Sequence, residues 1–96
     1  MSFIKEVKGE KTILKIEGAM SIYEATALRE AWMECFKNCE AMEIDLSGVS
    51  ECDITGAQLL FSARMMAEAT EKVFMITAVS PAVTEALAAA GLNPEP

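Results

Sequence analysis

The sequence predicts a small α/β domain with a single-layer mixed sheet of about four strands. We expect the element order β-β-α-β-α-β-α, with helices mainly on one face of the sheet. Apolar and polar side chains alternate from Met42 to Ser47, which is the period of a half-buried strand. Small and apolar residues then recur at helical spacing, at Gly56, Leu59, Leu60, Ala63, Met66 and Ala67. The chain therefore changes from strand to helix around residues 48–55.

The N-terminal part of the chain predicts a β-hairpin. Residues 3–7 and 12–17 have the composition of two short strands, and a charged turn containing Gly9 separates them. Ile13 and Leu14 are consecutive apolar residues, so we expect the second strand to be the more buried of the two. Gly18 is expected to end this strand.

A capping sequence predicts the start of the first helix. Ser21 is followed three residues later by Glu24, an arrangement that satisfies two free N–H donors at a helix N-terminus. Asn38 suits the helix end. Trp32 could offer a ligand platform, but its helical spacing favours core packing. The buried stripe that we expect consists of Ala25, Leu28, Ala31, Trp32, Cys35, Phe36 and Cys39.

The C-terminal part of the chain predicts one more strand and one more helix. Residues 73–79 form a continuous apolar run, as expected for a strand that is central in a sheet or covered on both faces. Ser80 and Pro81 begin the last helix, and Gly91 ends it. Helical connections between successive strands imply parallel neighbours and right-handed crossovers, which place the helices mainly on one face.

Length and charge bound the domain organisation and the partners. Ninety-six residues, 52% of them hydrophobic, predict one domain over residues 1–96, with 93–96 as a short tail. The net charge of −7 repels nucleic acid and anionic lipid surfaces, so neither is an expected partner. The longest apolar runs fall short of the roughly 20 residues that cross a bilayer, which argues against direct membrane insertion. Without a secretory signal, a cytoplasmic location is expected.

The residue types argue against an enzyme and against a cofactor. The sequence has no histidine and no Gly-rich phosphate loop, and its cysteines therefore lack the usual partner for nucleophilic catalysis. We interpret Cys35, Cys39 and Cys52 as reduced, small apolar residues rather than metal or redox groups. Asp45, Glu51 and Asp53 could together hold a divalent cation, but three carboxylates around a turn are usually solvated charges. We therefore predict no metal site.

The turn at residues 53–56 is the candidate functional site. Asp53 and Thr55 both carry oxygens able to cap the helix that follows, and a helix N-terminus presents N–H donors to an anion. Ile54, Gln58, Phe61 and Met65 lie off the core stripe at positions i, i+4, i+7 and i+11, so they predict an outward line, which we call the docking strip. The alternative is that Phe61 and Met65 pack against a neighbouring helix.

Several of these segments resemble STAS domains, the module of sulfate transporters and anti-sigma factor antagonists. Residues 44–49 followed by 53–60 are similar to the family's strand, loop and helix signature, in which Asp-Ser-Ser/Thr-Gly opens the helix. Residues 79–83 and 90–92 are similar to its closing segment. The resemblance spans nearly the whole chain. It implies a STAS-like fold and a non-enzymatic bacterial signalling module that binds a partner protein.

The resemblance also identifies the expected site residues. In the family, the serine after the aspartate is phosphorylated by a partner kinase, which releases the partner. Ile54 occupies that position and cannot accept phosphate, so only Thr55 offers a substitute hydroxyl, and Ser21 replaces a frequent acidic residue nearby. We therefore expect partner binding without the usual switch. The expected binding residues are Asp53, Ile54, Thr55, Gly56, Gln58, Phe61 and Met65.

The resemblance leaves the class of partner protein open. The sequence motif Asp-x-Thr-Gly-x-Gln-Leu-Leu is similar to that of STAS proteins in chemotaxis and histidine-kinase systems. Other members of the family oppose kinase-like anti-sigma factors. An alternative is an accessory subunit of a membrane lipid transporter, because some STAS proteins bind transporter ATPases. A self-complementary docking strip would also allow a homodimer.

Overall fold

The computed structural model describes residues 2–92, so the expected tail at 93–96 lies outside the described residues. The predicted succession of strands and helices is confirmed, with one short 3-10 turn, η1, added before the first helix. The elements are β1 (Ser2–Lys8), β2 (Lys11–Met20), η1 (Ile22–Glu24), α1 (Ala25–Lys37), β3 (Ala41–Cys52), α2 (Ile54–Ala69), β4 (Val73–Val79) and α3 (Pro81–Ala89).

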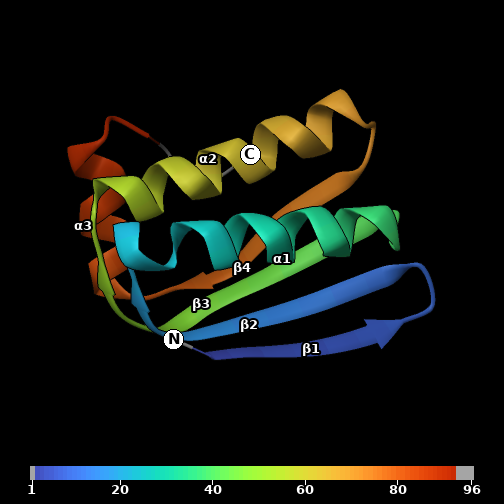
Figure 1. The fold of residues 1–96 in the computed structure, drawn as a ribbon, viewed down its shortest axis with the longest axis horizontal. Coiled ribbons are helices and arrows are strands. Elements are labelled where there is room, and N and C mark those ends of the chain that lie inside the picture. The colour runs from blue at the N-terminus through green and yellow to red at the C-terminus, as the bar shows by residue number, and fades with distance from the viewer. Residues whose placement is uncertain (1, 93–96) are drawn as a thin grey trace.

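The four strands form one mixed sheet in the order β1-β2-β3-β4. β1 runs antiparallel to β2, whereas β2, β3 and β4 are parallel to their neighbours. Helices α1 and α2 lie across one face of this sheet, and α3 lies at the end where the parallel strands finish (Figure 1). None of the described helices covers the opposite face. The prediction of helices on one face is therefore confirmed.

The core lies between the sheet and this helical layer. Alternate side chains of β2 and β3 point into it, and the register pairs Leu14 with Ile44. Trp32 is 1% exposed, which confirms core packing rather than a ligand platform. Each large side chain buried in this way contributes about 1.5–3 kcal/mol. The helices supply Leu28, Trp32, Cys35, Phe36, Ala57, Leu59, Leu60, Ala63, Ala67, Val83, Ala86 and Leu87 to the core.

Strand β4 differs from its prediction. It lies at the edge of the sheet and not in its centre, and its side chains alternate between exposed and half-buried. Val73 is 57% exposed on the face that no described helix covers. The expectation of a strand covered on both faces was wrong because a continuous apolar run does not reveal whether another layer exists to cover its second face.

Strand β2 continues beyond Gly18, which was expected to end it. Gly18 has φ +95°, and the pairing of β2 with β3 shifts register between Lys15 and Glu17 and again between Gly18 and Ala19. A glycine at positive φ lets a bulged strand bend without leaving the sheet. The strand therefore reaches Met20, at the edge where α2 begins.

The helix ends follow local hydrogen bonding. Ser21 Oγ accepts the N–H of Tyr23 and donates to the carboxylate of Glu24. The predicted reciprocal cap is thus altered, because the first turn is a tighter 3-10 turn and Glu24 contacts the serine hydroxyl instead of the serine N–H. Gly91, at φ +72°, closes α3 as predicted, and the Leu92 N–H donates to the Leu87 carbonyl at 2.8 Å.

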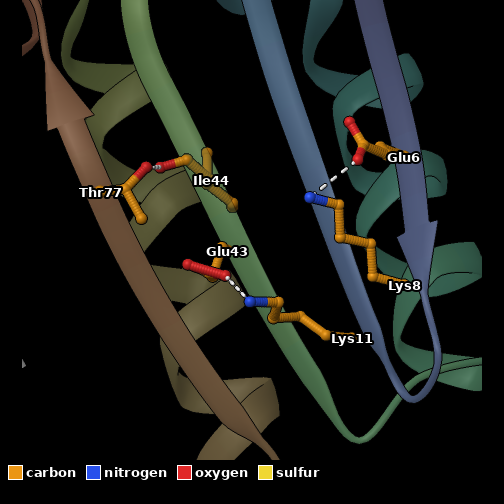
Figure 2. Close-up of polar contacts among 6 residues, drawn as sticks. All are labelled: Glu6, Lys8, Lys11, Glu43, Ile44 and Thr77. Atoms are coloured by element: carbon orange, nitrogen blue, oxygen red, sulfur yellow. Dashed lines mark hydrogen bonds and ion pairs between the residues drawn. The ribbon is translucent and has the colours of Figure 1, made fainter.

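The uncovered face of the sheet carries paired charges. Lys11 Nζ lies 2.8 Å from a carboxylate oxygen of Glu43, and Lys8 Nζ lies 3.1 Å from one of Glu6 (Figure 2). The Thr77 hydroxyl donates to the Ile44 carbonyl at 3.2 Å, where the register between β3 and β4 shifts.

In residues 2–92, no helix has the length and apolar character that crossing a bilayer requires.

Replacement of Leu59 tests the packing of α2 on the sheet. Leu59 is 5% exposed, so Leu59→Ala should lower the free energy of unfolding by about 2–5 kcal/mol through lost burial and the cavity left behind. Urea unfolding followed by circular dichroism measures this loss. The exposed neighbour provides the control, since Gln58→Ala should change stability by less than about 0.5 kcal/mol. A loss below about 1 kcal/mol for Leu59→Ala would contradict the packing described.

Candidate functional site

Asp53 connects three segments of the chain at the start of α2. Its Oδ1 accepts the Gly56 N–H at 2.9 Å, which caps the helix. Its Oδ2 accepts the N–H of Ile22, the first residue of η1, at 3.2 Å. Its own N–H donates to the Met20 carbonyl at the end of β2, at 3.3 Å. We call this set of contacts the Asp53 clip, because it fastens η1 and α2 to the same point.

The clip changes the interpretation of the helix N-terminus. The sequence indicated free N–H donors that could receive an external anion, but the carboxylate of Asp53 already occupies this end of the helix dipole. Of the two candidate caps, Asp53 is the residue that caps α2, and Thr55 lies within the first turn of the helix. The protein therefore supplies its own anion at this position.

Gly56 is required where α2 approaches β2. A Cβ at this position would lie 2.7 Å from the Met20 carbonyl oxygen and 2.9 Å from Cys52 Sγ. Both distances are shorter than van der Waals contact with a Cβ allows. The carbonyl belongs to the backbone, so it cannot move aside by a change of rotamer. The absence of a side chain thus allows the helix to begin against the sheet.

The docking strip lies on the surface, as predicted. Ile54 is 52% exposed, Phe61 42% and Met65 50%, and Gln58 is also exposed. Phe61 and Met65 are thus not buried against a neighbouring helix. At 1.5 Å per residue, the strip extends about 16 Å along α2.

Two further apolar residues adjoin the strip and were missed by sequence reasoning. Tyr23 is 92% exposed and Ile22 61%, and the Asp53 clip fastens their turn beside the start of α2. The sequence held one signal for them, since both follow the cap Ser21 and precede the buried stripe that begins at Ala25. We call Ile22, Tyr23 and the docking strip together the apolar surface.

Cys52 beside the site and Cys35 in the last turn of α1 are poor nucleophiles. Burial, aided by the negative charge of Asp53, raises the pKa of Cys52 to about 11. Burial also raises the pKa of Cys35. Both thiols are therefore protonated at neutral pH, and a protonated thiol neither attacks an electrophile nor binds a metal well.

Asp45 and Asp53, two of the three carboxylates considered as cation ligands, accept hydrogen bonds from the protein itself. Hydrogen bonds from the hydroxyl and the backbone N–H of Ser47 lower the pKa of Asp45, whereas both oxygens of Asp53 accept backbone N–H groups. Within residues 2–92, no three His, Cys, Asp or Glu side chains converge as a metal site requires. What the geometry offers in this region is an apolar contact surface on a fixed backbone.

A family model described as "Mlab, STAS domain" matches residues 5–94. The chain belongs to the STAS domain family. No curated protein sequence matches this STAS domain.

Three solved structures show the same fold. The anti-sigma factor antagonist SpoIIAA in its unphosphorylated form is 20% identical with a TM-score of 0.78, and the match covers 98% of this chain and 84% of that one. An anti-sigma factor antagonist from Mycobacterium paratuberculosis is 22% identical with a TM-score of 0.80, covering 94% and 77%. Phosphorylated SpoIIAA from Bacillus is 18% identical with a TM-score of 0.76, covering 98% and 87%.

Substitution of Gly56 tests the close approach of α2 to β2. Alanine is favoured over glycine inside a helix by about 1 kcal/mol, so propensity alone predicts that Gly56→Ala stabilises this STAS domain. We expect the opposite result, a loss of about 1–3 kcal/mol, because the new methyl group meets the Met20 carbonyl. Thermal unfolding measures the change, and Ser62→Ala on the exposed side of α2 is the control. A raised melting temperature for Gly56→Ala would contradict the geometry.

Proposed function

We propose that this STAS domain is a non-enzymatic signalling module that binds a partner protein through the 53–56 turn and the docking strip. The observation that carries the proposal is the line of large apolar side chains left exposed on α2. Contiguous exposed apolar surface on a soluble domain marks interaction sites, whereas isolated exposed apolar residues need no explanation. Ile22 and Tyr23, on the turn that the Asp53 clip fastens to the start of α2, add exposed apolar side chains from a second element.

The composition of the apolar surface supports a protein partner. Aromatic residues and methionine are enriched at protein interfaces, and Tyr23, Phe61 and Met65 supply them here. The Asp53 clip fixes the backbone on both sides of Ile54, so little ordering entropy is lost when a partner binds. The names of two structural neighbours, both anti-sigma factor antagonists, support a partner of the anti-sigma or related kinase type.

Binding without a phosphorylation cycle is the second part of the proposal. Ile54 is the first residue of α2 and has no oxygen that could receive phosphate. Thr55 offers a hydroxyl, but it follows the carboxylate of Asp53, which already satisfies the helix N-terminus. A phosphate there would add a charge of about −1.5 to −2 close in the chain to Glu51 and Asp53, and like charges repel.

Phosphorylation of Thr55 should accordingly be absent or slight in the native cells. Mass spectrometry of the purified protein measures the phosphorylated fraction of the peptide that contains residues 53–56. A synthetic phosphopeptide of the same sequence, added to the digest, controls for detection. Substantial phospho-Thr55 would contradict this part of the proposal without affecting the docking strip.

Two substitutions in the docking strip test partner binding. Phe61→Ala should weaken binding by about 2 kcal/mol, and Ile54→Asp should abolish it, because these apolar residues lie at the centre of the proposed interface. Capture of proteins from native lysate, followed by titration of the identified partner, measures the effect. Both variants should remain folded by circular dichroism, since the replaced side chains are exposed.

The control for these variants lies on the uncovered face of the sheet. Met75→Ala removes an apolar side chain of similar exposure on β4, far from α2 in the sheet order, and should leave binding unchanged. The captured protein identifies the class of partner, whether a chemotaxis or histidine-kinase protein, an anti-sigma factor or a transporter ATPase. Parental affinity in both folded docking-strip variants would mean that the interface lies elsewhere.

A further inference from the structure

A groove of about 410 Å³ lies beside the docking strip, between the end of β3 and helix α3. Cys52 and the small residues of α3, among them Ala82 and Ala86, supply its apolar lining, and Ile54 belongs to both the groove and the strip. Its volume lies within the roughly 300–1,000 Å³ of typical ligand pockets. A partner seated on the docking strip would therefore lie directly against this groove.

The groove also has a definite charge. Glu51 on the β3 side and Glu85 on α3 are both exposed and both line it, and none of the described lining residues is basic. Neither carboxylate forms an ion pair with another described residue. Two carboxylates above an apolar lining match a long basic side chain, whose aliphatic part packs on apolar surface while its charged end meets the acids.

We propose that this groove receives an arginine side chain of the partner protein, an inference that rests on the proposed function and adds the chemistry of the partner. Arginine fits better than lysine, because its planar guanidinium has five donors and can bond to two carboxylates at once. The apolar contacts with Cys52 and the alanines of α3 would hold the methylene groups. The partner then combines an apolar patch for the docking strip with one arginine placed beside it.

Nuclear magnetic resonance titration of the full chain with two peptides tests the inference. The probes are acetyl-Leu-Arg-Leu-amide and the same peptide with citrulline, which has the shape of arginine without its charge. We expect amide shifts at residues 51–54 and 82–89, and an affinity for the arginine peptide at least about fivefold higher than for the citrulline peptide. Glu85→Gln and Glu51→Gln should each lower this affinity about threefold or more.

The matched control is Glu68→Gln, which removes an exposed carboxylate near the other end of α2 and should leave the affinity unchanged. Equal binding of the two peptides, shifts outside the groove, or full affinity in Glu85→Gln would each overturn the inference. Sedimentation of the free protein tests whether a second copy of the chain occupies the groove. A dimer that dissociates in the Glu85→Gln variant would show this and would also overturn the inference.

The two proposals fail in distinguishable ways. The peptide titration uses the groove alone, whereas capture of the partner by Phe61→Ala reports on the docking strip alone, because Phe61 does not line the groove and Ile54 lines both. Loss of capture in the strip variants together with no arginine preference overturns the groove assignment and leaves the proposed function intact. Capture that depends on neither strip residue overturns the proposed function whatever the peptides show.

Discussion

The hydrogen bonds of the Asp53 carboxylate are the constraint on which the arrangement of η1 and the start of α2 depends. One oxygen satisfies the first turn of α2 and the other satisfies η1, so the loss of either bond would leave a helix-end donor without its partner. A cap of this kind typically contributes about 1 kcal/mol. The clip works only because Gly56 has no side chain, since a Cβ would meet the Met20 carbonyl before the helix reached the sheet.

The clip also explains why apolar side chains are exposed here. Ile54 directly follows the cap, whereas the buried face of α2 begins at Gly56, so the helix period turns Ile54 outward. Phe61 and Met65 repeat that direction about two and three turns further along the helix. Their exposure is therefore a consequence of where the helix starts, and a shift of the cap by one residue would rotate all of them. The position of one carboxylate sets the direction of the whole docking strip.

Local periodicity predicted the parts of the fold that depend on local sequence. The alternation in β3 and the stripe in α2 identified most of the core, because each pattern is complete within one element, although Ala57 was missed and Met66 is only half-buried. The edge position of β4 depends on which layers surround it, which its own apolar run does not encode. The exposed pair Ile22 and Tyr23 depends on a hydrogen bond between residues 31 positions apart, so no local pattern could place them beside the docking strip.

The ion pairs of this domain and the carboxylates beside the docking strip lie in different places. Lysines of β1 and β2 pair with glutamates on the uncovered face of the sheet, whereas Glu51 and Glu85 beside the docking strip have no such partner among the described residues. Two carboxylates without an ion pair thus lie next to exposed apolar side chains. In such an arrangement, the charges govern how fast and in which orientation a basic partner arrives, and the desolvated apolar contacts govern how long it stays. A partner of the proposed kind would need both features, an apolar patch and a basic side chain, at a spacing that matches the groove and the docking strip on either side of Ile54.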